Sequence, residues 1–400
     1  QLQLRGGTTS EHNSFTGVSR EVTVDTTKKT LVVHDGSTAG GTPLMKESGT
    51  TGDITINSIN IGKGANSVAG NTVLGESALD ASVSGGSNTA IGKSALTTLT
   101  SGTSNTAVGL ESLELNTTGS HNTAVGVRAS EANTTASENT AIGRSALYAT
   151  TSGGKNTAVG RSALKDNTTG IQNVAVGTFS LDAATADNNN VAVGYGSLTN
   201  NNGGENCVAV GSFALEENTT ANHNTAVGNQ ALEFNTTGAN NTAVGANALD
   251  ANTTGERNTA IGRNALSAVT TGSNNVAAGV NALNSNTASS NTAVGDAALY
   301  TNSSGQNNVA MGRNALFLNT TGEQNTAIGT YALDENTTAS ENTAVGYQAL
   351  TSNTTGLENT ALGRQASQFN TTGNYNTSVG VNALRDNTTA SNNTSVGHAA

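Results

Sequence analysis

Residues 105–121 read NTAVGLESLELNTTGSH, and residues 122–138 read NTAVGVRASEANTTASE. The same frame returns along most of the chain. Its first residue, the anchor, stands at 71, 88, 105, 122, 139, 156, 173, 190, 207, 224, 241, 258, 275, 291, 308, 325, 342, 359, 376 and 393. The interval is 17 residues except for one of 16, and only Cys207 among these twenty anchors is not Asn. A fixed period of this length is the signature of a solenoid, in which each unit stacks on its neighbours.

We number each unit from its anchor. Position 2 is Thr or Val, position 3 is nearly always Ala, position 4 is apolar, position 5 is always Gly, and position 9 is Leu in nearly every unit. Thr and Val favour strands, in which positions 1, 3 and 5 share one face and positions 2 and 4 the other. Gly at position 5 suits a bend or a positive φ. Positions 12–15 usually read Asn-Thr-Thr-Gly, which is turn chemistry. Each unit therefore predicts a short strand, a turn, a second segment around Ala-Leu, and a polar loop.

This pattern predicts an all-β fold, an elongated parallel β-solenoid (β-roll) of about twenty 17-residue coils over residues 71–400. Apolar residues do not recur with helical spacing, and the units are rich in Gly, Thr and Asn, which disfavours helices. One coil cannot be stable alone: ordering 17 residues costs on the order of 17–34 kcal/mol of backbone entropy, and burying one Val and one Leu returns about 3–6 kcal/mol. Coils must stack, and the small residues at position 3 suggest that several chains pack side by side.

Composition and charge exclude several classes of protein. The chain has 400 residues with a net charge of −11 and 3% aromatic residues. A nucleic-acid binder needs clustered Lys and Arg, so no nucleic-acid partner is expected. No run of 18 apolar residues occurs, so we expect no membrane insertion. A single cysteine, Cys207, excludes an intrachain disulfide and a Cys-based zinc site.

The sequence supports no catalytic, cofactor-binding or metal-binding residues, and we expect no cofactor and no enzyme activity. The five histidines occupy unrelated registers and are expected in solvated turns, and Cys207 is expected to be a small residue in a crowded row. The many Asn-x-Thr triplets keep a fixed register, which favours turn formation over glycosylation. Aromatic residues stand at differing registers, so we expect no stripe for stacking sugar or nucleic acid. The carboxylates are scattered: Glu111, Glu114, Asp182, Glu216 and Glu217.

The repeats resemble a known family. Asn190-Val191-Ala192-Val193-Gly194 and residues 139–143, followed by Ala-Leu, are similar to the head repeats of trimeric autotransporter adhesins. The resemblance implies parallel β-rolls assembled as homotrimers. The family unit usually has fourteen residues, and we expect the extra three in the Asn-Thr-Thr loop.

The amino-terminal segment resembles a different family. Residues 3–9 read QLRGGTT, and they are followed by FTG (15–17), EVTVD (21–25), TLVVHDG (30–36) and GGTPL (40–44). This ordered set looks like the amino-terminal module of phage tail fibres of the major tropism determinant type. From the residues alone it predicts one strand plus a hairpin, because Val22/Val24 and Leu31/Val33 alternate around a turn at 26–29. The resemblance implies attachment to the virion.

These observations divide the chain into a β module at 1–46 for attachment to the virion, a transition or capping segment at 47–70 with strand-like Ile54, Ile56, Ile59 and Ile61, and a β-roll shaft at 71–400. The favoured hypothesis is a trimeric phage tail fibre, located in the virion and extracellular, that links tail or baseplate proteins to a host cell-surface receptor. The alternatives are an adhesin passenger on a bacterial surface and a tailspike-type polysaccharide depolymerase. Because the last unit stops at position 8, we expect the repeats to continue past Ala400, where a receptor-binding end could lie.

Overall fold

The computed structural model describes residues 5–16, 21–27, 30–34, 37, 39, 42–43, 46–48 and 53–400. The chain divides into two compact units, residues 1–154 and 155–400. Among the described residues the helical segments are short, namely α1 (Thr9–Ser14) and the 3₁₀ turn η2 (Ala65–Ser67), and the remaining regular structure is strand. The predicted all-β class is confirmed.

The first unit opens with a small sheet whose strand order is β1-β2-β3-β4. Its strands are β1 (Arg5–Gly7), β2 (Val22–Asp25), β3 (Thr30–Val33) and β4 (Thr42–Pro43). β2 and β3 form the antiparallel hairpin that the sequence predicts, and β1 pairs parallel with β2. Lys28 and Lys29 of the predicted turn lie outside the described residues. Helix α1 was not predicted; it begins with a capping box in which Thr8 Oγ1 accepts from the Glu11 N–H and the Glu11 carboxylate accepts from the Thr8 N–H.

An antiparallel meander precedes the first coil. It consists of β5 (Lys46–Ser48), β6 (Asp53–Ile56) and β7 (Ile59–Gly62), and β7 pairs antiparallel with β8 (Thr72–Gly75). The alternating isoleucines of this segment therefore do lie on strands. The buried Asp53 carboxylate fixes the end of β7, because it accepts from the Lys63 and Gly64 N–H groups at 2.7 Å each.

Parallel coils fill the rest of the first unit. β8 is followed by β9 (Thr89–Ile91), β10 (Thr106–Val108), β11 (Thr123–Val125) and β12 (Thr140–Ile142). Successive strands pair in parallel with a register of 17 residues, as in the pairing of Thr106 with Thr123. Each coil thus places its position-2 residue beside position 2 of the next coil.

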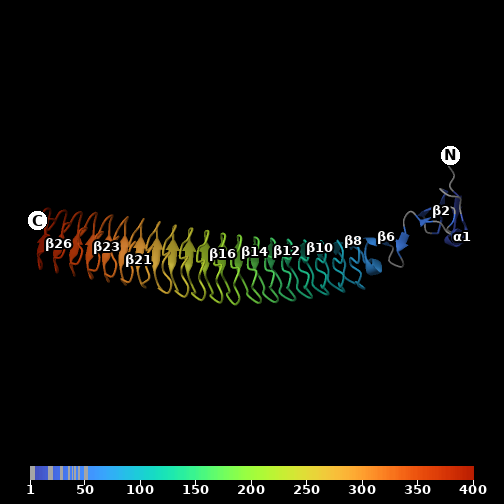
Figure 1. Ribbon diagram of the computed structural model, residues 1–400, viewed down its shortest axis with the longest axis horizontal. Helices are drawn as coiled ribbons and strands as arrows, with labels where there is room; N and C mark the ends of the chain where they lie inside the picture. Colours follow the sequence, from blue (N-terminus) through green and yellow to red (C-terminus); the bar gives the residue numbers. More distant parts are fainter. Residues whose placement is uncertain are drawn as a thin grey trace. The chain divides into compact units, whose positions relative to one another are not determined.

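The second unit is one stack of parallel coils, which Figure 1 shows as a file of strands coloured from green to red. Its strands are β13 (Thr157–Val159), β14 (Val174–Val176), β15 (Val191–Val193), β16 (Val208–Val210), β17 (Thr225–Val227), β18 (Thr242–Val244), β19 (Thr259–Ile261), β20 (Val276–Ala278), β21 (Thr292–Val294), β22 (Val309–Met311), β23 (Thr326–Ile328), β24 (Thr343–Val345), β25 (Thr360–Leu362), β26 (Thr377–Val379) and β27 (Thr394–Val396). With β8–β12 they make twenty strands of the repeat, one for each predicted coil.

The core of each coil is narrow and built from small residues plus one leucine. In the coil that begins at Asn241, Ala243, Ala248 and Leu249 are completely buried. Leu249 has a φ of +56°, and the leucines at position 9 of the other coils share this left-handed conformation. That conformation costs a branched residue roughly 1–2 kcal/mol, whereas burying a leucine returns about 1.5–3 kcal/mol. Burial therefore holds position 9 in a backbone geometry that leucine disfavours.

The small-residue face of the strand lies inside the coil. The position-3 alanines, such as Ala175 and Ala226, are completely buried within the chain's own core, and the residues at positions 2 and 4 point outward. The expectation that position 3 faces neighbouring chains is therefore wrong. The physical reason is that position 3 points into the narrow interior of the coil, where a small residue fits; it is Ala in every coil except at Val73, Ser378 and Ser395.

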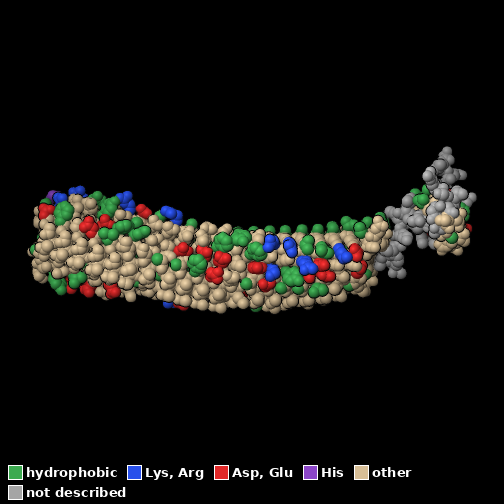
Figure 2. Space-filling view, in the orientation of Figure 1, with side chains coloured by type: hydrophobic (Ala, Val, Ile, Leu, Met, Phe, Trp, Pro, Cys, Tyr) green, Lys and Arg blue, Asp and Glu red, His purple; other side chains and the backbone are tan. Residues whose placement is uncertain are grey.

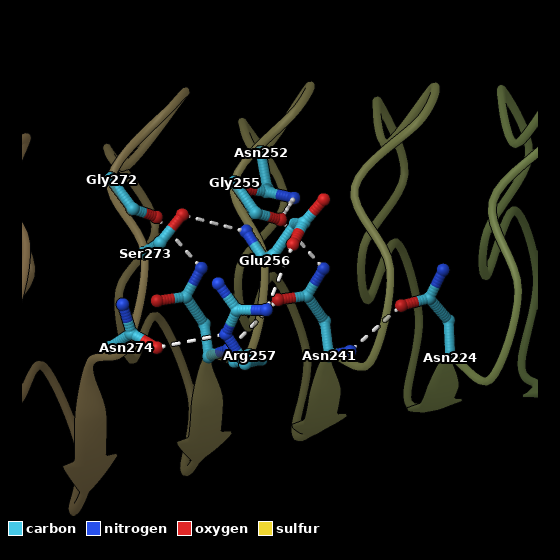
Figure 3. A network of polar contacts seen from close by, with 10 residues as sticks. Asn224, Asn241, Asn252, Gly255, Glu256, Arg257, Gly272, Ser273 and Asn274 are labelled. Atoms are coloured by element: carbon cyan, nitrogen blue, oxygen red, sulfur yellow. Dashed lines mark hydrogen bonds and ion pairs between the residues drawn. The ribbon is translucent and has the colours of Figure 1, made fainter.

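The anchor asparagines form a buried row, here called the first asparagine ladder. Figure 3 shows Asn224 and Asn241 in adjacent coils. The Asn241 N–H donates to Asn224 Oδ1 (2.8 Å), the Asn258 N–H donates to Asn241 Oδ1 (2.9 Å), and Asn241 Nδ2 donates to the Gly255 carbonyl (2.8 Å). Each side chain joins its strand to the neighbouring coil and to position 15 of its own coil, which explains the near-invariance of the anchor.

The position-12 asparagines form a second asparagine ladder. Asn235 Nδ2 donates to Asn218 Oδ1 at 3.0 Å, and Asn252 Nδ2 donates to Asn235 Oδ1 at 2.7 Å. Each also donates to the carbonyl of position 15, three residues on. The Asn-Thr-Thr-Gly segment is thus a turn, as predicted, but its asparagine is a core residue. Because these asparagines are buried, a glycosylating enzyme cannot reach them in the folded chain.

Two features of the structure, the backbone conformation and the distance to the next coil, require glycine at position 5. Gly245 has a φ of +140°, a region that L side chains rarely adopt. A Cβ there would also lie 2.6 Å from the Gly262 carbonyl of the next coil. Close stacking and backbone conformation together explain why this residue never varies.

Candidate interaction surface

In each unit the outward face of the strands carries a row of apolar side chains, here called the aliphatic row. It consists of the position-4 residues, which Ile, Val, Leu or Met occupies in nearly every coil. Its more exposed members are Leu74, Val125 and Ile142 in the first unit, and Val176, Val227, Val244, Ile261, Val294, Met311, Ile328, Leu362 and Val396 in the second. Single exposed apolar residues are normal, but exposed apolar side chains in the same register of neighbouring coils make a candidate interaction site.

The remaining surface carries little charge. Figure 2 shows that uncharged polar side chains and backbone cover most of the visible face, with acidic and basic side chains in small groups. One such group in the first unit contains Glu111, Glu114 and Glu131, whose carboxylates approach within 4.8 Å of one another. The Arg128 guanidinium pairs with Glu111 at 2.7 Å and with Glu131 at 3.5 Å. An arginine already neutralises part of this cluster, so the geometry supports an ion-pair network at the surface.

Position 10 borders the corner of the coil and is half-buried. Thr199 Oγ1 and Thr351 Oγ1, both at position 10, donate to the carbonyls of Phe179 and Tyr331 in the preceding coil (3.2 and 3.0 Å). Where position 10 is Asp, no such donor exists. Burial raises the pKa of Asp182 and raises that of Asp334 to about 6. Among the described residues, Oδ1 of each is buried without a hydrogen-bond partner.

Aromatic side chains from different registers meet at the same corner. Phe179 and Phe213 stand at position 7, and Tyr195 between them stands at position 6. Tyr195 lies 6.2 Å from Phe179 and 5.3 Å from Phe213 between ring centroids, with edge-to-face geometry. The expectation of no aromatic stripe is therefore wrong at this place, because positions 6 and 7 of successive coils converge. Aromatic residues alternate between positions 7 and 6 in these coils, and comparing adjacent positions as well as identical ones would have indicated the contact.

Two deviations from the repeat lie close together in the second unit. Cys207 is completely buried, its thiol faces the Ala221 carbonyl at 3.3 Å, and burial raises its pKa to about 11. This confirms a small residue in a crowded row. Asp187 replaces Gly at position 15, in a coil where Ala184 replaces the position-12 Asn. Its carboxylate accepts from Asn201 Nδ2 at 2.8 Å, so it fills the gap in the second asparagine ladder, and burial raises its pKa to about 6.

The histidines fall into two groups. His121, His223 and His398 are exposed, as expected. His12 on α1 and His34 directly after β3 are buried, so the expectation of solvated turns is wrong for them. Both imidazoles contact one hydroxyl: Thr23 Oγ1 lies 2.8 Å from His12 Nε2 and 3.0 Å from His34 Nε2. Sequence patterns could not show that residues 12, 23 and 34 meet, because their proximity depends on how α1 packs beside the hairpin.

No helix among the described residues has the length and apolar character needed to cross a membrane. The site geometry thus offers an apolar strand face, a polar surface of low charge, and aromatic clusters at one corner. These are features of an interaction surface.

Comparison with known proteins places the amino-terminal module. Residues 2–38 match the major tropism determinant N-terminal domain. The chain is also 64% identical over 45 residues to the tail fiber receptor-binding protein of Bordetella phage BPP-1. That alignment covers 11% of this chain and 12% of the relative, so it concerns only a small part of each. At its amino terminus the chain is therefore similar to a phage tail fibre receptor-binding protein.

Proposed function

We propose that this chain is a structural fibre of a bacteriophage tail, in which the amino-terminal module binds tail or baseplate proteins and the coils form a shaft directed at a host cell-surface receptor. The observation that carries the proposal is the 64% identity of the amino-terminal segment to a phage receptor-binding fibre, joined in one chain to a β-solenoid. In this proposal the protein is extracellular, part of the virion, and not an enzyme.

The shaft is proposed to be a homotrimer. The aliphatic row supports association of identical chains, because the row recurs in the same register in coil after coil and a second copy presents the matching surface. Burying it would remove apolar side chains from water along each stack of coils, at about 25 cal/mol per Å². The threefold number comes from the resemblance of the repeats to adhesin heads. Three identical shafts also increase avidity for a receptor without any new contact.

Three measurements test this proposal. Electron microscopy of virions labelled with antibody against residues 1–46 should place the label at the tail, and absence of label there would refute the fibre assignment. Sedimentation equilibrium of the purified chain should give three times its mass of 39.8 kDa. Incubation with host polysaccharide should release no reducing sugar, whereas release would favour a depolymerase.

A further inference from the structure

Two stretches of the second unit carry the same surface side chains in the same register. Each set spans three successive coils. The first coil has Arg at position 6, and the second has an aromatic residue at position 7 and Asp at position 10. The third coil has Tyr at position 6 and Thr at position 10. The first set is Arg161, Phe179, Asp182, Tyr195 and Thr199, and the second is Arg313, Tyr331, Asp334, Tyr347 and Thr351. Every pair is separated by 152 residues, which is nine coils. We call these sets the first and second aromatic clusters.

The two clusters also share their geometry. The Arg161 guanidinium lies 4.9 Å from the Phe179 ring centroid, and Arg313 lies 5.1 Å from the Tyr331 centroid. The next ring in each cluster packs edge-to-face, at 6.2 Å and 79° for Tyr195 and at 6.4 Å and 78° in the second cluster. The arginine, the first ring and the second ring are therefore reproduced in space as well as in sequence, whereas Phe213, which packs on Tyr195 at 5.3 Å, is matched by Gln365 in the second cluster.

The solenoid itself does not require these side chains. Positions 6, 7 and 10 vary widely among the other coils. Position 7 has a positive φ, of +60° at Phe179 and +59° at Tyr331. The repeat imposes this conformation at position 7 in every coil, including at Phe213 with a φ of +58°. The match of the two sets in residue type and register, and not the backbone conformation, therefore points to a role beyond folding.

The side chains in each cluster combine an apolar ring with polar groups that still have bonding capacity. Tyr195 and Tyr347 are 50% and 46% exposed. Asp182 and Asp334 lie three residues after the position-7 ring, and side chains at positions 7 and 10 do reach each other, as in the hydrogen bond from Gln230 to Glu233. Oδ1 of each aspartate is buried without a hydrogen-bond partner among the described residues, so the polar groups that a surface ligand can reach are those of the arginine and the tyrosine.

We propose that the two aromatic clusters are equivalent saccharide-binding sites, each of which takes a pyranose ring of a cell-surface glycan. A pyranose has an apolar C–H face that packs on a tyrosine ring, and hydroxyl groups that accept from an exposed guanidinium such as that of Arg161 or Arg313. This inference rests on the proposed fibre function and adds the chemical class of its receptor.

The distribution of the clusters favours a glycan over a second copy of the chain. Packing of copies along the shaft uses a surface present in every coil, and the aliphatic row provides one. The clusters occur at two places, about 43 Å apart at about 4.8 Å per coil. Two equivalent sites at that separation suit a repetitive polymer, which can occupy both and gain avidity.

The test uses the full-length chain on a microarray of purified bacterial surface polysaccharides, followed by calorimetric titration with an oligosaccharide cut from any polysaccharide that binds. Wild-type protein should bind two oligosaccharides per chain. Tyr195→Ala and Tyr347→Ala should each bind one with unchanged affinity, and should bind the intact polysaccharide at least tenfold more weakly. The double variant should bind none. Tyr375→Ala, which removes a tyrosine that is 53% exposed outside both clusters, is the matched control and should bind two.

Three results would overturn the inference: no polysaccharide retains the wild-type chain, the double variant still binds two oligosaccharides, or the double variant dissociates during sedimentation, which would make the clusters a subunit interface. Labelling of virions with antibody against residues 1–46 does not depend on these tyrosines. Tail labelling without glycan binding would therefore refute the saccharide sites alone, and absence of tail labelling would refute the fibre assignment.

Discussion

Replacing Asn241 by alanine should destabilise the shaft substantially, although the change removes only one amide group. Asn241 is completely buried, its Oδ1 accepts from the Asn258 N–H at 2.9 Å, and its Nδ2 donates to the Gly255 carbonyl at 2.8 Å. Without the side chain the Asn258 N–H has no acceptor, which costs about 1–3 kcal/mol. The Gly255 carbonyl keeps its bond from Asn252 Nδ2 and loses the other, at about 0.5–1.5 kcal/mol. The expected loss is roughly 2–4 kcal/mol per chain.

Urea denaturation followed by circular dichroism measures this loss as a change in the free energy of unfolding. Asn229→Ala is the matched control, because that asparagine is exposed and makes one long bond, to the Ser212 carbonyl at 3.4 Å. The control should stay within about 0.5 kcal/mol of the wild type. If Asn241→Ala falls in the same range, the first asparagine ladder does not stabilise the coils and the argument for an invariant anchor fails.

Three further experiments test other parts of the structure. The buried Cys207 thiol, with its pKa at about 11, should not react with iodoacetamide at pH 8 until urea unfolds the chain; rapid labelling of folded protein would show that the coil opens there. Gly245→Ala should lower the melting temperature more than any alanine substitution at an exposed position, because a Cβ would meet the next coil, and an unchanged melting curve would contradict that packing. The pKa values of Asp187 and Asp334 are about 6 in the folded chain against the usual 3.8, so the folded state binds their protons more tightly. Stability should therefore rise as the pH falls from above 6 towards 4, as measured by urea midpoints, and Asp334→Asn should reduce that rise; a flat profile would show that these carboxyls are solvated.

The sequence by itself determined the period, the strands and the turns. A 17-residue repeat with β-branched residues at position 2 admits strands but not helices, and an invariant glycine after the strand requires a bend. These features are local, so propensity and spacing are enough to find them. The hairpin at residues 22–33 was equally readable, because its apolar residues alternate with period 2 on both sides of a turn.

The tertiary structure alone decided which face of the strand is inside. Alternation separates Asn-Ala-Gly from Thr-Val, but it does not say which set is buried, and the apolar Val appeared the better core residue. The inner side of the coil takes small residues at nearly every position 3, with Val73 as a buried exception, and the anchor amides find their partners in the neighbouring coil and at position 15 of their own coil. The left-handed leucine at position 9 has the same origin, since packing between coils outweighs its backbone preference. The aromatic clusters, the meeting of His12 with His34, and the place of Asp187 in the second asparagine ladder likewise depend on contacts between residues that stacking or sheet pairing brings together. Residue propensities and spacing along the sequence do not describe such contacts.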